Sequence, residues 1–403
     1  MIRNGKKKAI SCALVAAMSV GLAACGTTSY DFKVSYDGIK TGDVSSKVSV
    51  HDPSILKADG EYYIFGSHMS AAKSSDLLNW EKVADGYSKK NPVYGQIYDV
   101  ADEAFAYSGS KNSLIKTDDK QVHVWAPDVI YNETTGLYYM YYCTTSTWNA
   151  SNLCYGTSTT PEGPYEWQGA LIYSGFNRKT ISGTDVLDYV DEDYAYKNYI
   201  KGAQYNYEDY PNAIDPTVFY DADGRMWMVY GSWSGGIFLL EIDKTTGLVI
   251  HPEADKANNV DPYYGKRLLG GGHISIEGPY IMYDETSGYY YLFVSYGALT
   301  SNGGYQVRVF RSKTVDGEYV DMNGKYPEKS AQHQNFGLKL TGNYKLPSLE
   351  KAYMATGHNS AFVDDDGRMY LVYHTRFNDN GEGHSPRVHQ MLVNEDGWPC
   401  ELP

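Results

Sequence analysis

The sequence predicts an all-β protein, a five-bladed β-propeller, and three observations support this prediction. Five segments of the 403-residue chain repeat one hairpin pattern. Nothing in the sequence between them has the 3.6-residue apolar period of a long amphipathic helix. Aromatic residues make up 14% of the chain, with 40 tyrosines, and aromatic side chains pack well on the pleated surface of a sheet. Repeated hairpins without intervening helices are typical of propellers, whose blades are small antiparallel sheets around a central channel.

Each of the five segments has a head residue, a short apolar strand, a turn rich in Asp, Asn or Gly, and an aromatic strand. Turns such as KADGE, DADGR and DDDGR have the composition of tight β-hairpins. Successive heads are 74, 89, 62 and 81 residues apart, which leaves room for large loops, since a short propeller blade needs only about 40–50 residues. The segments are DPSILKADGEYYIFGS from Asp52, APDVIYNETTGLYYMYY from Ala126, DPTVFYDADGRMWMVYGS from Asp215, EGPYIMYDETSGYYYLFVS from Glu277 and HNSAFVDDDGRMYLVYHT from His358.

The longest insertion, roughly residues 180–210, is rich in tyrosine and acidic residues and has no clear period. We expect it to be an ordered loop on the face of the heads. It could be a wall of a substrate site or a surface excursion without function.

Residues 1–24 are expected to be a lipoprotein signal peptide. The basic stretch MIRNGKKK precedes the apolar stretch AISCALVAAMSVGLAA. The motif LAAC that ends at Cys25 resembles the bacterial lipobox, which implies that Cys25 becomes a lipidated N-terminus at the cell surface or outer membrane. A plain secretory signal or an uncleaved anchor are the alternatives. Residues 25–47 would then be a polar tether and residues 48–403 the propeller.

Charge and cysteine content limit the possible partners. The formal net charge is −14, and it falls to −18 without the four basic residues of the signal segment. So acidic a surface argues against nucleic acid and anionic lipid, and is compatible with a neutral polymer. Membrane contact is expected only through the lipid anchor.

Cys143 and Cys154 flank a predicted hairpin loop and could pair in an oxidising compartment, although two free thiols are favoured. No cysteine spacing indicates zinc.

The heads are expected to meet at one end of the propeller axis, because the innermost strand of every blade borders the channel. Three heads are the acids Asp52, Asp215 and Glu277, and a fourth is the imidazole of His358. Charges among apolar strands are costly unless they are paired, and crowded carboxyls raise and separate one another's pKa values. The pattern therefore predicts a functional site.

Carboxyls gathered in this way favour glycoside hydrolysis. One carboxyl protonates the leaving oxygen, and another activates water or attacks the sugar. A third can orient the acid and keep its pKa high.

Five short strings stand at the segment heads, namely HDPSI at 51–55, WAPDV at 125–129, NAIDPTVF at 212–219, SIEGPY at 275–280 and GHNS at 357–360. In these strings the chain resembles glycoside hydrolase family 43. The longer strings GSWSGGIFLLEID and HTRFNDNGEGHSPRVHQMLVNEDGWP are similar to the endo-acting arabinanase branch of that family. The resemblance extends in order from about residue 50 to residue 399.

The resemblance implies a role for each acid. Asp52 would be the general base that activates water, Glu277 the general acid, and Asp215 the residue that tunes and positions the acid. Inversion in one displacement would place base and acid roughly 6.5–9.5 Å apart. The branch also implies a calcium ion on the propeller axis, held through His358 and several waters, and an oxygen-rich shell suits calcium. The alternative for His358 is a hydrogen-bonded core histidine.

Other residues are weaker candidates for sugar contacts. Three tryptophans and one tyrosine follow or flank predicted strands, so their rings could stack on sugar rings or pack in the core. One histidine lies beside the base and could instead cap a strand, and another precedes the acid. These candidates are Trp125, Trp148, Trp233, Tyr296, His51 and His273.

The expected function is cleavage of internal α-1,5 bonds in plant cell-wall arabinan or arabino-oligosaccharides. An exo-acting α-L-arabinofuranosidase or β-xylosidase is the first alternative, because one scaffold can host several substrates. A non-catalytic surface glycan-binding propeller is the second, and the intact set of three carboxyls argues against it.

Overall fold

The computed structural model describes residues 45–46, 48–100, 105–108, 115–117, 120–145, 150–326, 336–345, 351–377 and 383–401. The lipobox with Cys25, most of the predicted tether, and Trp148 lie outside these residues. Among the helices in the described ranges, none has the length and apolar character needed to cross a membrane.

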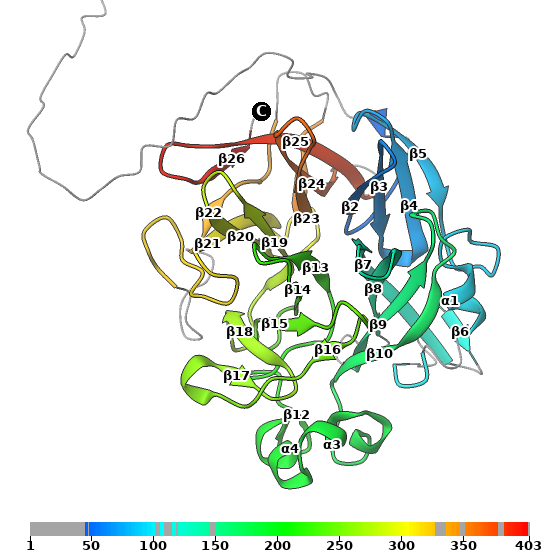
Figure 1. Cartoon of the computed structure of the whole chain (residues 1–403), viewed down its shortest axis with the longest axis vertical. Helices are drawn as coiled ribbons and strands as arrows, with labels where there is room; N and C mark the ends of the chain where they lie inside the picture. Colours follow the sequence, from blue (N-terminus) through cyan, green and yellow to red (C-terminus); the bar gives the residue numbers. More distant parts are fainter. Residues whose placement is uncertain are drawn as a thin grey trace, which may run out of the picture. The chain divides into compact units, whose positions relative to one another are not determined.

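The described residues form an all-β structure, which confirms that part of the prediction (Figure 1). The first two sheets each contain five strands and have the orders β1-β5-β4-β3-β2 and β10-β9-β8-β7-β6. Their strands are β1 (Ser45–Ser46), β2 (Ser54–Ala58), β3 (Glu61–Gly66), β4 (Ser70–Ser74), β5 (Asn79–Ala84), β6 (Ile115–Thr117), β7 (Lys120–Asn132), β8 (Leu137–Thr145), β9 (Ser151–Ser158) and β10 (Glu166–Ser174).

The second half of the chain forms a six-stranded and an eight-stranded sheet. In the larger sheet the parallel pair Gln306–Thr356 links two antiparallel groups of strands. The strands are β13 (Thr217–Tyr220), β14 (Met226–Tyr230), β15 (Ile237–Ile242), β16 (Val249–Ile250), β17 (Val260–Asp261), β18 (Gly265–Leu269), β19 (Ile276–Asp284), β20 (Tyr289–Tyr296), β21 (Gln306–Ser312), β22 (Leu338–Lys339), β23 (Met354–Val363), β24 (Met369–Arg376), β25 (Ser385–Val393) and β26 (Pro399–Glu401).

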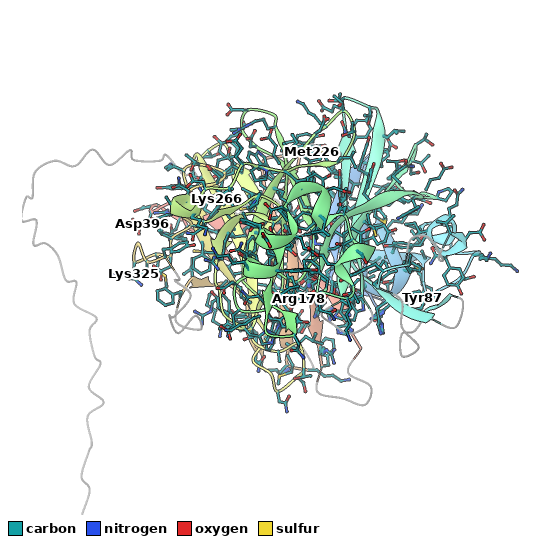
Figure 2. All side chains as sticks on the ribbon, turned by 90° about the horizontal axis from the view of Figure 1, so that it is seen from below. Tyr87, Arg178, Met226, Lys266, Lys325 and Asp396 are labelled. Atoms are coloured by element: carbon teal, nitrogen blue, oxygen red, sulfur yellow. The ribbon has the colours of Figure 1, made fainter. Side chains whose placement is uncertain are left out.

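The insertion before β13 forms short helices and a two-stranded sheet, where we expected a loop. Asp191 caps the longest helix by accepting a hydrogen bond from the Tyr194 N–H at 2.7 Å. Arg178, labelled beside these helices in Figure 2, lies 4.6 Å from the centre of the Tyr196 ring. The helices and short strands outside the main sheets are η1 (Ser67–Met69), α1 (Gly95–Asp99), η2 (Ile181–Gly183), α3 (Val186–Tyr189), α4 (Glu192–Asn198), β11 (Ile200–Lys201), β12 (Gln204–Tyr205) and η3 (Lys256–Asn258).

The strands that begin the five repeated segments contact one another in a closed circuit. Strand β2 contacts β7, β7 contacts β13, β13 contacts β19, β19 contacts β23, and β23 contacts β2. Side chains reinforce the circuit, since Thr217 Oγ1 donates to the Pro279 carbonyl at 2.8 Å and Ser360 Oγ donates to the Pro53 carbonyl at 2.9 Å. The circuit brings together residues that lie far apart along the chain.

Asp128 on β7 is a buried carboxyl that joins three strands of this circuit. It accepts one hydrogen bond from the Ser54 hydroxyl of β2 and another, at 2.6 Å, from the Val218 N–H of β13. Burial raises its pKa from 3.8 to about 7, although these hydrogen bonds oppose the shift. The folded protein therefore holds the Asp128 proton at pH values where the unfolded chain has lost it.

We expect Asp128→Ala to lower the free energy of unfolding by about 1–3 kcal/mol, because a buried N–H and hydroxyl lose their acceptor. Asp128→Asn keeps an acceptor and should cost less. Because folding raises the pKa of Asp128, the contribution of Asp128 to the free energy of unfolding is complete below pH 3.8. That contribution is lost as the pH rises through about 7. In denaturant titrations from pH 4 to 8, the free energy of unfolding of the Asn variant should therefore rise relative to that of the wild type. A difference that does not depend on pH would contradict this account.

Cys143 and Cys154 do not form a disulfide with each other, as favoured from the sequence. They lie on the adjacent strands β8 and β9, but Cys154 is opposite Tyr142 rather than Cys143. Neighbouring residues of a strand point to opposite faces of the sheet, and the two thiols accordingly belong to different core clusters.

Candidate active site

The heads of the repeated segments share a left-handed backbone. The φ angle is +56° at Asp52, +42° at Ala126, +56° at Asp215, +57° at Gly278 and +49° at His358. Outside glycine this conformation costs roughly 1–2 kcal/mol per residue, and backbone strain of this kind concentrates at functional sites. The shared geometry makes Asp52, Ala126, Asp215, Gly278 and His358 equivalent positions of the five segments.

The prediction that Glu277 is itself a head is wrong by one residue, because Gly278 has the left-handed conformation. A side chain at position 278 would bring its Cβ to 3.1 Å from Cγ of His358. Glycine is therefore needed where the His358 ring packs against the backbone, and the carboxyl is carried by the preceding residue, within β19.

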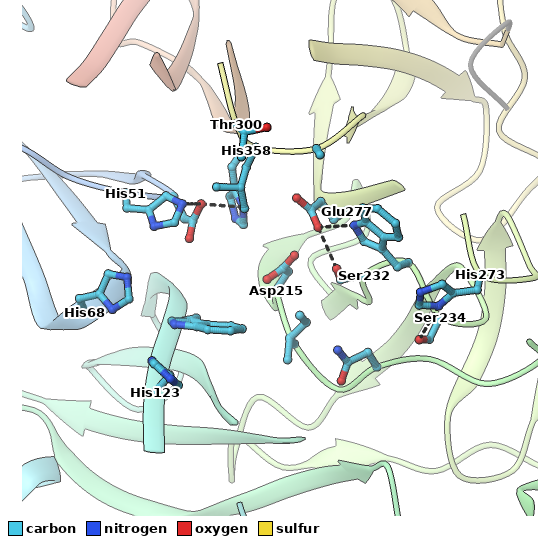
Figure 3. A pocket seen from close by; sticks show the side chains of 17 residues that line it. His51, His68, His123, Asp215, Ser232, Ser234, His273, Glu277, Thr300 and His358 are labelled. Carbon is cyan, nitrogen blue, oxygen red and sulfur yellow. Dashed lines mark hydrogen bonds and ion pairs between the residues drawn. The ribbon is translucent and has the colours of Figure 1, made fainter. Parts of the chain in front are cut away.

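One cavity of about 820 Å³ brings the three predicted carboxyls together (Figure 3). Asp52, Asp215, Glu277 and His358 all line it, although they come from four different segments. Among the weaker candidates, Trp125, Trp233, His51 and His273 also line the cavity. Tyr296 is instead buried in a core cluster, so the packing alternative holds for it. The lining residues that the sequence analysis did not single out include His68, His123, Asn212, Ser232, Ser234 and Thr300.

Asp52 is buried and surrounded by hydrogen-bond donors. Its Oδ1 lies 3.0 Å from Nδ1 of His358 and 3.1 Å from Nε2 of His51. Its Oδ2 accepts a hydrogen bond from the Ser67 hydroxyl at 2.5 Å. Burial opposes ionisation, but the charge and hydrogen bond of His358 outweigh it and hold the pKa of Asp52 well below its usual range. Asp52 is therefore a carboxylate that can accept a proton.

His358 is the cationic partner in this group. Burial alone would lower its pKa, but the charge and hydrogen bond of Asp52 raise that pKa to about 9. Its backbone N–H donates to the Ser295 hydroxyl at 2.7 Å, which holds the strained head in place.

Asp215 and Glu277 have the opposite protonation tendency. Asp215 Oδ2 accepts the Gly278 N–H at 3.1 Å. Burial raises the pKa of Asp215 to about 7 against the effect of His358, with help from the charges of Glu277 and Asp52. Burial likewise raises the pKa of Glu277. Neighbouring carboxyls whose pKa values are shifted in opposite directions are the arrangement that acid–base catalysis requires.

The residues that hold the heads share a signal that the sequence analysis missed. Ser67, Ser295 and His374 all lie within about two residues of the end of the aromatic strand of their segment. Each accepts the backbone N–H of the next head along the circuit, namely Ala126 at 2.9 Å, His358 at 2.7 Å and Asp52 at 3.2 Å. An aligned set of polar residues after the aromatic strands could have revealed them.

Three histidines beside Asp52 are close enough to suggest a metal, since ring nitrogens of His51, His374 and His384 lie within 4.8 Å of one another. The His51 and His384 rings, however, stack at 3.7 Å with 15° between their planes. Their in-plane lone pairs run parallel and do not converge on one ion. Burial also lowers the pKa of all three. The cluster is therefore a packed group of neutral imidazoles.

The comparisons with known proteins agree with this geometry. The extracellular endo-α-(1→5)-L-arabinanase of Thermotoga petrophila is 40% identical over 362 residues, covering 87% of this chain and 69% of that protein. Extracellular endo-α-(1→5)-L-arabinanase 2 of Bacillus subtilis is 37% identical over 386 residues, covering 89% and 71%. The crystal structure of an endo-1,5-α-L-arabinanase from Thermotoga petrophila matches with a TM-score of 0.73 at 38% identity, covering 88% of this chain and 74% of that one.

A protein-family model also matches most of the chain. The model of glycosyl hydrolases family 43 matches residues 44–210 and 191–399, which include every sheet that contributes a head to the cavity. The model match and the two relatives at 40% and 37% identity show that the chain belongs to glycosyl hydrolases family 43.

Proposed function

We propose that the protein hydrolyses internal α-1,5-L-arabinofuranosidic bonds of arabinan by a single inverting displacement. The observation that carries the proposal is one cavity in which Asp52, whose pKa is lowered, accompanies Glu277, whose pKa burial raises. The substrate class is supported by the two relatives at 40% and 37% identity, which are both named endo-arabinanases.

In the proposed reaction Asp52 takes a proton from a water molecule while the water oxygen attacks the anomeric carbon. Glu277 gives its proton to the glycosidic oxygen as the C–O bond breaks, and the new hemiacetal has the inverted configuration. Asp215 is linked to this acid through the Gly278 N–H. Repulsion between the carboxyls of Asp215 and Glu277 favours the protonated acid.

The proposed scaffold is a five-bladed propeller over residues 48–403. The closed circuit of β2, β7, β13, β19 and β23 supports it, because each strand belongs to one antiparallel group and has one head within it or just before it. A propeller places such equivalent positions around one axis.

The mode of cleavage is tested by the lengths of early products from linear debranched arabinan. We expect a ladder of oligosaccharides in the first minutes, because an endo enzyme cuts within the polymer. Release of arabinose alone from the start would indicate the exo-acting alternative. Tight binding without any hydrolysis over a day would indicate a glycan-binding protein instead.

A calcium ion bound through His358 is proposed as well. His358 lines the cavity, and its Nδ1 faces Asp52 at 3.0 Å, so a metal would have to use Nε2, with water as the remaining ligands. Because calcium prefers oxygen ligands, water would have to supply most of the shell, and Nε2 of His358 could take one position only after losing its proton. When bound, the ion would supply positive charge beside the catalytic carboxyls.

If calcium is held at His358, chelation should lower both the melting temperature and the turnover of the purified protein. Added calcium should restore both, whereas a His358→Gln variant should show no response of its melting temperature to chelation or calcium. Calorimetric melts before and after treatment with chelator measure this directly. Unchanged melting and turnover of the wild type after thorough chelation would remove calcium from the account.

We also propose that the protein is lipid-anchored outside the cytoplasm through Cys25. The lipobox-like motif supports the lipid, and the names of both relatives as extracellular support export. Fatty-acid labelling in a bacterial host should mark the wild type and not Cys25→Ala. Equal labelling of the two would contradict the anchor.

A further inference from the structure

The acid Glu277 receives two hydrogen bonds on the same oxygen (Figure 3). The indole Nε1–H of Trp233 donates to Oε2 at 2.8 Å, and the Ser232 hydroxyl donates to Oε2 at 3.0 Å. From the sequence we expected Trp233 to stack on a sugar ring. The structure shows that its polar edge is used by the acid.

The Trp233 indole is held firmly in this place. Trp233 follows strand β14 in a left-handed conformation, with φ at +53°. Its backbone N–H donates to the Ile276 carbonyl at 2.8 Å, directly before Glu277 in the chain. The His273 ring lies 5.6 Å from the indole ring. Backbone strain of this kind concentrates at functional sites, which indicates that the orientation of the indole beside the acid is functionally important.

The two donors restrict where the proton of Glu277 can be. An indole N–H can only donate, so a proton on Oε2 would compete directly with the Trp233 hydrogen bond. Oε1 is therefore the oxygen that carries the proton. Building on the proposed function, we propose that Trp233, with Ser232, is a positioning residue that orients the acid so that Oε1 delivers the proton to the glycosidic oxygen.

Both donors also stabilise the ionised form of Glu277 and so set the upper pH limit of activity. The other groups that act on this carboxyl are His358 and Tyr305, which favour its ionised form, and Asp52, which opposes it. Asp215 is electrostatically linked to it as well. Substituting Trp233 leaves these four groups in place, so a change in the pH profile reports on the indole.

The test is the pH profile of kcat/KM on linear arabinan for Trp233→Phe. Loss of a hydrogen bond to a charged acceptor should move the alkaline limb up by about one pH unit. The value of kcat at the optimum should fall by about 10- to 100-fold, because the acid is no longer held in its orientation. Ser232→Ala should move the limb in the same direction, and it serves as the readout if Trp233→Phe fails to fold.

Trp227→Phe is the matched control. It removes an indole N–H that donates to a different carboxylate, Asp221, at 2.8 Å. Trp227 lies on β14, the strand that Trp233 follows. Its alkaline limb should stay at the wild-type position. A Trp233→Phe variant that only raises KM, with the limb unmoved, would make Trp233 a sugar platform and overturn the proposal. Retained turnover in Glu277→Gln would instead refute the proposed acid, which keeps the two failures distinct.

Discussion

Glu277→Gln is expected to lower kcat on linear arabinan by about 10²–10⁴-fold, the usual contribution of general acid catalysis. Glutamine has the same shape and can keep an oxygen as the acceptor for Trp233 and Ser232. It cannot give a proton to the leaving oxygen, so KM should change little. The alkaline limb of the pH profile should disappear, because the group whose deprotonation causes it is gone.

An activated substrate separates loss of the acid from loss of the fold. An arabino-oligosaccharide with a dinitrophenolate leaving group needs no protonation, so Glu277→Gln should cleave it at a rate close to that of the wild type. Glu166→Gln, which makes the same exchange at an exposed position on β10, should leave turnover on arabinan unchanged. Near-normal cleavage of arabinan by Glu277→Gln would show that another group is the acid.

Asp52→Ala is expected to lose activity by a similar factor of about 10²–10⁴, because no group remains to take the proton from water. Added azide should restore part of the rate, since azide is an anion that attacks without losing a proton. Its nitrogen bonds to the anomeric carbon, the glycosidic C–O bond breaks, and Glu277 protonates the leaving oxygen. The product should be an arabinosyl azide with inverted configuration, which NMR identifies.

Ser67→Ala is the comparison for this experiment. It keeps the Asp52 carboxylate and removes the hydroxyl that donates to Oδ2 at 2.5 Å. Its activity should not respond to azide, because the base is still present. A glycosyl azide of retained configuration from Asp52→Ala would argue for a double displacement and against the single inverting step.

The repeated pattern explains why so much of the site could be predicted. Hairpin turns and alternating aromatic strands are local signals, and in a closed circuit equivalent positions converge without any further information. Asp52, Asp215, Glu277 and His358 do line one cavity as expected. The one-residue error at Glu277 arose because the pattern does not show which residue is left-handed, whereas the packing of His358 against Gly278 decides it.

The aromatic candidates show the limit of local signals. Trp125 and Trp233 line the cavity, while Tyr296 is buried in the core, although all three are aromatic residues in or beside a segment strand. The local sequence does not say which face of a strand is covered by the next sheet. The contact of Trp233 with Glu277 joins two sheets and has no counterpart in either sequence segment alone.

The sequence by itself determined the all-β class, the repeated hairpins and the acids that gather in the cavity, because these follow from side-chain periodicity and turn chemistry within short stretches. Only the tertiary structure decided the direction in which the pKa of each acid shifts and which group hydrogen-bonds to its carboxyl oxygens. Those properties depend on burial and on distances of about 3 Å between groups from different sheets, such as Asp52 with His358, and no local pattern encodes them.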